Sequence, residues 1–179
     1  IKKLAKEDRR IKVIINSRNF GHIRSPIHGL FQAKGDAMIL MMADFQDPVD
    51  LMPKYISEWE QGRDVVLAQK NVSGENFFSH FTKKIFYNFI KSISEVSLMT
   101  NTTGSGLFDK KIIEEIKKID DPYPYFRGLL SEITSNIKLI KFYQPKRKKG
   151  KTKNNFYTLY DLGILGIVKH SKIPLRLIT

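Results

Sequence analysis

A short apolar run that ends abruptly in acidic residues does most to limit what this chain can fold into. Residues 37–42 (AMILMM) read as a buried strand, and the polar sequence ADFQDP follows at 43–48. In an open α/β sheet, the loop after the carboxyl end of a strand carries ligand-binding side chains, because the strand holds that loop still. We therefore expect a binding site at Asp44, Gln46 and Asp47.

The chemistry of these side chains suggests a metal ion. Carboxylate and amide oxygens are hard ligands that suit Mg²⁺ or Mn²⁺, and such ions commonly bridge to a diphosphate. A helix cap is a simpler interpretation of Asp47, because Asp47-Pro48 is typical of a helix start. Capping explains neither Asp44 nor Gln46, so both interpretations of Asp47 stay open.

Strand and helix patterns alternate along the chain. Periodicity and Gly or Pro stops predict strands at 11–15, 37–42, 64–68 and 137–143, and helices at 22–33, 49–61, 76–96, 109–118, 126–132 and 155–170. Residues 100–106 are small and polar and are expected to form a loop. This alternation is typical of an α/β protein with a mainly parallel sheet flanked by helices, in which the last strand is an edge or antiparallel one. The aromatic face of helix 76–96 has the spacing of core packing, or of a surface for a lipid or partner.

The charge of the chain points to phosphate-bearing partners. It carries 31 Lys and Arg residues against 18 Asp and Glu, a net charge of +13, and six of the nine residues at 145–153 (PKRKKGKTK) are basic. Nucleic acid, nucleotides and an anionic membrane surface would all suit such a charge. The absence of cysteine excludes disulfides, thiol catalysis and cysteine-bound zinc. No apolar run approaches the ~20 residues of a membrane span.

Several motifs follow one another in a fixed order. They are SRNFG at 17–21, GD at 35–36, ADFQDP at 43–48, WEQGRDVV at 59–66, GLFD at 106–109, FRGL at 126–129, GKTK at 150–153 and PLR at 174–176. In this order they resemble family 2 glycosyltransferases of the dolichol-phosphate-mannose synthase and bactoprenol glucosyltransferase type. The resemblance covers nearly the whole chain.

The resemblance implies a GT-A fold, which is Rossmann-like, and a glycosyltransferase of cell-envelope polysaccharide synthesis. Such an enzyme moves a sugar from a nucleotide-sugar donor, usually to a polyprenyl-phosphate acceptor at the cytoplasmic face of the membrane, with inversion at the anomeric carbon. In that family an acidic motif holds a divalent ion on the donor diphosphate. Asp44 and Gln46 match its second Asp and its Gln, while Met42 stands at its first Asp. Because a thioether is a poor ligand for Mg²⁺ or Mn²⁺, the resemblance implies a weakened or rearranged metal site.

The resemblance also suggests cations for the phosphates. Lys70, Lys84 and Lys153 lie where the family carries basic residues near the donor and acceptor phosphates, and Arg147 belongs to the same basic run as Lys153. An ordinary surface charge is the alternative at each of these positions.

The need for a general base depends on the acceptor. An acceptor that is already a phosphate anion needs none, whereas a hydroxyl acceptor needs a carboxylate to take its proton. Glu132 and Asp47 are the candidates for that base, with a surface acid as the alternative for Glu132.

The resemblance also implies a division of the chain. The family normally begins with further strand-helix units that cradle the nucleoside, and it continues into membrane-spanning helices. We therefore expect a GT-A domain at 1–145 that is incomplete at its amino end, and a basic loop with an amphipathic juxtamembrane segment at 146–179. Such a fragment is expected to be soluble or peripheral, and an exposed strand edge would favour a homo-oligomer.

Two other function classes stay open. The basic run beside aromatic residues predicts salt-dependent binding to nucleic acid. The acidic residues Asp44, Asp47 and Asp50 would repel a phosphate backbone, so we expect no nucleic-acid partner. A non-catalytic protein on an anionic membrane surface would use the same basic run and the terminal segment.

Overall fold

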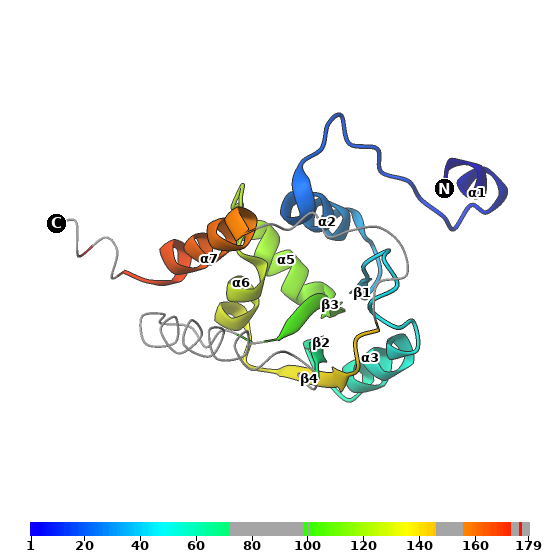
Figure 1. Ribbon diagram of the computed structural model, residues 1–179. Coiled ribbons are helices and arrows are strands. Elements are labelled where there is room, and N and C mark those ends of the chain that lie inside the picture. Colours follow the sequence, from blue (N-terminus) through cyan, green and yellow to red (C-terminus); the bar gives the residue numbers. More distant parts are fainter. Residues whose placement is uncertain (72–98, 100, 146–155, 173–175, 177–179) are drawn as a thin grey trace.

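The computed structural model describes residues 1–71, 99, 101–145, 156–172 and 176. These residues form a four-stranded sheet with helices on both faces (Figure 1). The strands are β1 Ala37–Leu40, β2 Val65–Lys70, β3 Thr102–Asp109 and β4 Ile137–Phe142. The helices are α1 Lys2–Glu7, α2 Gly21–Gln32, α3 Leu51–Glu60, α5 Lys110–Ile119, α6 Phe126–Ile133 and α7 Phe156–His170. The predicted helix at 76–96 lies outside the described residues.

The strand order is β1-β3-β2-β4. β3 pairs antiparallel with β1 and with β2, and β4 pairs parallel with β2, with Val66 opposite Lys138. It follows that β1, β2 and β4 all point the same way, and their carboxyl ends meet at one edge of the sheet. The predicted α/β fold with flanking helices is confirmed. The sheet is mixed and not mainly parallel in its pairing, because the central strand β3 runs against both of its neighbours. The expectation that 137–143 is an edge strand is confirmed within the described sheet, and its direction is parallel.

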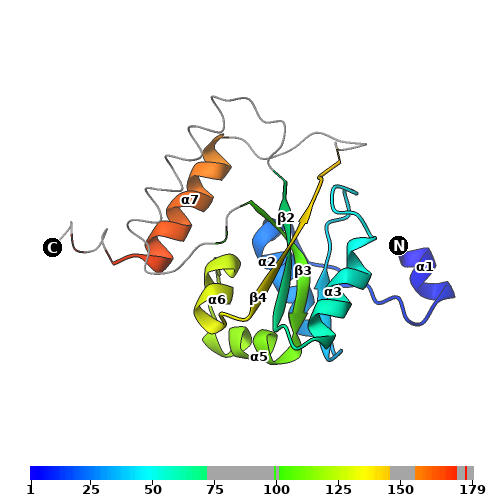
Figure 2. The same ribbon diagram turned by 90° about the horizontal axis from the view of Figure 1, so that it is seen from below.

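Alternating side chains of the central strands divide the core into two layers. Val65 and Leu67 pack with residues of α2, α5 and α6, whereas Val66 and Ala68 pack with Leu51 and Tyr55 of α3. This alternation is what a strand covered on both faces requires. Figure 2, which views the sheet along its edge, shows α5 and α6 on one side and α3 on the other.

The segment expected to be a loop at 100–106 is instead the start of β3, the strand between β1 and β2. A Cβ atom at Gly106 would lie 2.3 Å from the carbonyl oxygen of Val66, so β3 lies too close to β2 for a side chain there. The predicted loop was wrong because small residues, which lower strand propensity, are required here by the neighbouring strand.

The segment at 11–15 was predicted to be a strand, and this prediction was wrong. Its backbone has no strand partner among the described residues, and Ile14 and Ile15 are exposed. An apolar β-branched run becomes a strand only where a neighbour accepts its backbone hydrogen bonds. Figures 1 and 2 show this segment as a connection to α1, which stands apart from the rest of the molecule and buries no side chain.

Candidate functional site

The carboxyl ends of β1, β2 and β4, with the amino end of β3, define a candidate site, which we call the carboxyl edge. The Asp44 loop follows β1, Lys70 ends β2, and β3 begins at Thr102 on the same edge. The backbone N–H of Lys70 donates to the carbonyl of Asn101 at 2.9 Å, and that of Asn71 donates to Phe142 of β4 at 2.9 Å. These contacts hold the ends of β2, β3 and β4 together, toward the top of Figure 2.

The loop after β1 makes a sharp turn at Phe45. The φ angle of Phe45 is 58°, in the left-handed region that non-glycine residues rarely adopt, and its side chain is 74% exposed. The Oδ1 atom of Asp44 accepts a hydrogen bond from the backbone N–H of Gln46 at 3.2 Å. The side chain of Asp44 therefore holds the backbone of Gln46 within the same turn.

Gln46 also links this loop to the end of β4. Its Nε2 atom donates to the carbonyl oxygen of Pro145 at 3.5 Å, across 99 residues of sequence. In the sequence, Pro145 directly precedes the basic residues. The predicted phosphate-binding residues Arg147 and Lys153, and also Lys84, lie outside the described residues.

Asp47 lies beneath the loop and not on its surface. It is only 4% exposed, and its Oδ2 atom accepts a hydrogen bond of 2.5 Å from the hydroxyl of Ser105 in β3. Its Oδ1 atom is buried and has no hydrogen-bond partner in the described part of the chain. The helix that follows begins without a side-chain cap, so the capping interpretation of Asp47 is wrong.

Tyr55 of α3 lies close enough to Asp47 to sense its charge. Burial, together with the negative charge of Asp47, raises the pKa of Tyr55 to about 12. The hydroxyl of Tyr55 is buried and, among the residues described, has no hydrogen-bond partner. Two buried oxygens beneath the loop, Oδ1 of Asp47 and the hydroxyl of Tyr55, thus lack a hydrogen-bond partner among the described residues.

The side chains at this edge fit a metal ion only in part. In the described ranges, no three His, Asp or Glu side chains converge in a way that could hold an ion. Met42 lies near Gly104, whose Cβ, if present, would be 3.9 Å from the methyl carbon of Met42. Mg²⁺ is commonly bound through one or two carboxylates together with substrate phosphates. Asp44 and Gln46 therefore fit an ion that arrives with a diphosphate, and do not fit an ion caged by protein alone.

Lys70 and Glu132, the two remaining candidates, lie in different places. Lys70 is exposed at the end of β2, on the carboxyl edge. Glu132 is exposed on α6, two residues before Thr134, whose hydroxyl bonds to Asp64 at the start of β2. The structure brings Lys70 to the edge that carries Asp44, and it places Glu132 near the opposite edge.

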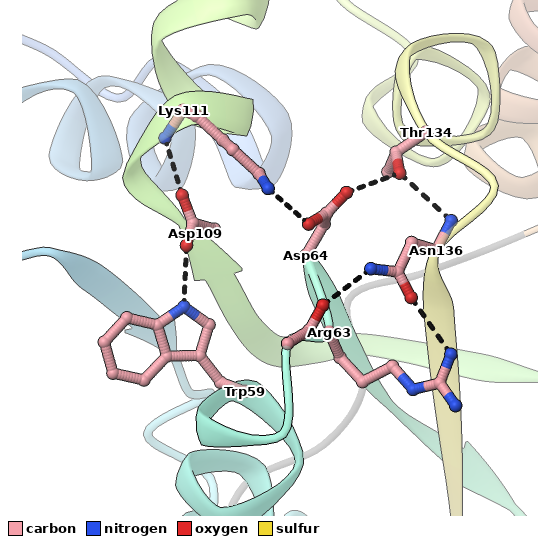
Figure 3. Close-up of polar contacts among 8 residues, drawn as sticks. Trp59, Arg63, Asp64, Asp109, Lys111, Thr134 and Asn136 are labelled. Atoms are coloured by element: carbon pink, nitrogen blue, oxygen red, sulfur yellow. Dashed lines mark hydrogen bonds and ion pairs between the residues drawn. The ribbon is translucent and has the colours of Figure 1, made fainter.

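The opposite edge of the sheet carries a hydrogen-bond network, shown in Figure 3. The indole Nε1 of Trp59 donates to Asp109 at 2.7 Å, and the ammonium of Lys111 lies 2.6 Å from Asp64. The Thr134 hydroxyl donates to the other oxygen of Asp64 at 2.9 Å. The network joins α3, β2, β3, α5 and the start of β4. The motifs at 59–66 and 106–109 therefore supply structural residues at this edge.

Two carboxylates in this network have defined roles. Burial raises the pKa of Asp64, but hydrogen bonds from Lys111, Thr134 and Asn136, with the charge of Lys111, lower it more, and the net pKa is below its ordinary value. Asp109 accepts a hydrogen bond from the backbone N–H of Lys111 at 2.9 Å and so caps α5, as the sequence predicted.

The last described helix carries an exposed apolar stripe. α7 is attached to the fold through the ammonium of Lys169, which lies 2.7 Å from Asp121, and through Gly166, which packs against Tyr125. Four exposed side chains share one helix face, because they recur at helical spacing: Tyr157, Tyr160, Ile164 and Val168. None of the helices in the described portion is long and apolar enough to cross a bilayer.

Sequence reasoning missed Ser105 and Tyr55. Ser105 lies in a stretch of small residues, and nothing local distinguishes it from a loop serine. Tyr55 has the helical spacing of a core residue, which it is, and the sequence carries no sign of its proximity to Asp47.

Comparisons with known proteins agree with this architecture. Residues 1–117 match the description Glycosyl transferase family 2. The chain is 32% identical over 171 residues to "Uncharacterized glycosyltransferase YkcC" of Bacillus subtilis (strain 168), covering 95% of this chain and 53% of that protein. It is 31% identical over 180 residues to "Prophage bactoprenol glucosyl transferase homolog" of Escherichia coli (strain K12), covering 100% and 59%.

A third relative carries the same activity in its name. The chain is 30% identical over 180 residues to "Bactoprenol glucosyl transferase" of Shigella phage SfV, covering 100% of this chain and 59% of that protein. The chain thus spans little more than half the length of these curated relatives. The family match covers well over half of the chain, and the fold and the carboxyl edge are consistent with it, so the chain belongs to glycosyl transferase family 2.

Proposed function

We propose that this chain is the sugar-transferring part of an inverting glycosyltransferase that uses a nucleotide-sugar donor and a polyprenyl-phosphate acceptor. One observation carries the proposal: the Asp44 loop, Lys70 and Pro145, the residue before the basic run, lie at one edge of the sheet. The names of the bactoprenol relatives support the choice of acceptor.

The residues at this edge suit the departure of a diphosphate. In the transfer, the bond between the anomeric carbon and the donor's phosphate oxygen breaks, while a bond to an acceptor phosphate oxygen forms on the opposite face. The leaving diphosphate gains negative charge, and the ammonium of Lys70 would stabilise it. Mg²⁺ or Mn²⁺, when bound with the donor, would add positive charge on the same oxygens. Asp44 and Gln46 would orient that ion.

An acceptor phosphate would enter this step as an anion. It needs no carboxylate to remove a proton, which agrees with the position of Glu132 away from Asp44. The basic run that starts after Pro145 would attract the acceptor by its charge.

The test is sugar transfer to undecaprenyl phosphate by the whole gene product. We expect Lys70→Gln to lower kcat by about 10²-fold, the order found when one fixed donor is removed from a charged transition state. Asp44→Ala should lower transfer at least as much. Lys117→Gln, which removes the same charge from the exposed surface of α5, serves as the matched control. Transfer that depends on neither Asp44 nor Lys70 would contradict the proposal.

We also propose that the enzyme works at the cytoplasmic face of a membrane, with residues 146–179 as the membrane-facing part. Tyrosine is favoured at membrane interfaces, and basic residues favour anionic lipid. The exposed stripe of α7, which follows the basic run in the sequence, supports this orientation.

Vesicle binding tests the membrane proposal. We expect Tyr160→Ser with Ile164→Ser to weaken sedimentation with phosphatidylglycerol vesicles, because both side chains would lose apolar contact with the interface. Ile119→Ser, which changes an exposed isoleucine of α5, is the control. Equal sedimentation of the double variant and the control would show that α7 does not contact the membrane.

A further inference from the structure

The burial of Asp47 separates it from the other side chains of its loop. Asp44 and Gln46 lie at the turn, whereas Asp47 is 4% exposed and points to Ser105 of β3. A general base must reach the proton that it removes, directly or through one water molecule. Asp47 offers no exposed oxygen for that purpose.

Burying Asp47 in this way is unfavourable in itself. A carboxylate that leaves water needs hydrogen bonds on both oxygens, and here only Oδ2 has one in the described chain. The buried hydroxyl of Tyr55 adds a second unpaired oxygen nearby. Unfavourable local arrangements of this kind persist mainly where the surrounding structure imposes them, and they are concentrated at functional sites.

Ser105 is a rigid attachment point for the loop. Its backbone N–H donates to the hydroxyl of Thr103 at 3.3 Å, and it is fully buried in the strand between β1 and β2. The next residue, Gly106, lies so close to β2 that the backbone has little room to shift. The hydrogen bond from Ser105 therefore holds the loop at a fixed position relative to the sheet.

The loop needs such an attachment because its turn is strained. Phe45 adopts a left-handed conformation, and Asp44 lies on one side of it while Asp47 lies two residues beyond on the other. We propose that Asp47 and Ser105 are positioning residues: their buried hydrogen bond fixes the loop so that Asp44 and Gln46 face the donor diphosphate. The proposal rests on the proposed function and assigns Asp47 no part in proton transfer.

Four variants test the proposal. Ser105→Ala removes the donor, Asp47→Ala removes the acceptor, and Asp47→Asn keeps an oxygen that can still accept from Ser105. Thr134→Ala is the matched control, because it removes a hydroxyl-to-carboxylate hydrogen bond of 2.9 Å at the opposite edge of the same sheet. Hydrogen exchange of the amides at 43–50 and sugar transfer to undecaprenyl phosphate are measured for each.

We expect Ser105→Ala and Asp47→Ala to speed exchange at 43–50 by about 10-fold, the order expected for loss of one charged hydrogen bond. Both should also lower kcat, while Asp47→Asn stays within about 10-fold of the parent. Thr134→Ala should leave exchange at 43–50 unchanged. Because exchange needs no substrate, it decides the positioning role even if the parent chain transfers no sugar.

Two results would overturn the proposal. If Ser105→Ala left exchange at 43–50 at the parent rate, the hydrogen bond would not fix the loop. If exchange in Asp47→Asn matched the parent while its kcat fell by about 10² to 10⁴, Asp47 would act in proton transfer. Should Asp47→Ala fail to fold, Ser105→Ala and Asp47→Asn still give both readouts.

Discussion

Replacing Tyr55 by phenylalanine tests the description of the loop's floor. The hydroxyl of Tyr55 is buried without a described partner, and the ring packs in the core between α3 and the sheet. Phenylalanine keeps the ring and removes only the oxygen. An unpaired buried hydroxyl costs about 1–3 kcal/mol, so we expect Tyr55→Phe to raise the free energy of unfolding by about 1 kcal/mol at pH 7.

The effect should grow at high pH. The pKa of Tyr55 is raised from 10.0 to about 12, so between these values the unfolded chain releases the proton and the folded chain keeps it. Below pH 10 the proton stays on Tyr55 in both states, and stability does not depend on this group. As the pH rises from 10 through 12, the parent protein loses stability, because the folded state holds the proton more tightly than the unfolded state. At pH 11 this linkage removes about 1.4 kcal/mol from the parent protein and nothing from the variant.

Urea unfolding at pH 7 and pH 11 measures both effects. The advantage of Tyr55→Phe over the parent should rise from about 1 to about 2.4 kcal/mol. Tyr143→Phe is the control, because that ring is 70% exposed and its substitution should change stability by less than about 0.5 kcal/mol. Destabilisation of Tyr55→Phe at pH 7, or a difference that does not grow with pH, would refute the reasoning.

Three further substitutions probe the scaffold. Gly106→Ala should destabilise the fold by about 3 kcal/mol or more in urea unfolding, because its Cβ would lie 2.3 Å from a backbone oxygen of β2; Gly29→Ala, which has open space in α2, should not destabilise. Trp59→Phe should lower the free energy of unfolding by about 2 kcal/mol, since Asp109 loses a hydrogen bond of 2.7 Å. An unchanged midpoint of urea unfolding would contradict the network. Because the pKa of Asp64 is lowered, its ionised form stabilises the fold at pH values above the ordinary pKa of 3.8, and this stability is lost as the pH falls. In Asp64→Asn, the free energy of unfolding should therefore fall less steeply with decreasing pH than in the parent. An equal slope in both proteins would count against the ion pair.

The local part of the site could be predicted from the sequence. The apolar run at 37–42 and the polar residues after it are contiguous, so one strand and its loop were enough to identify Asp44 and Gln46. Lys70 was singled out by the resemblance to the family, and the structure places it at the end of β2. Because β1 and β2 point the same way, both positions lie at the same edge of the sheet.

The parts that failed depend on distant neighbours. Gly106 of β3 is required because β2 lies against it, and no local pattern reports that proximity. The hydrogen bond between Ser105 and Asp47 joins residues 58 positions apart, and the bond between Trp59 and Asp109 joins residues 50 apart. The run at 11–15 had the composition of a strand without a partner to pair with it.

The central claim is that a diphosphate binds at the carboxyl edge, and an NMR titration tests it most directly. Inorganic pyrophosphate with Mg²⁺ is added to the ¹⁵N-labelled chain, and amide shifts are followed at both edges of the sheet. The account predicts shifts at Asp44, Lys70 and Ser105, with Asp64 and Asn136 unmoved. Shifts confined to Asp64 and Asn136, or none at Asp44 and Lys70 at millimolar pyrophosphate, would contradict it.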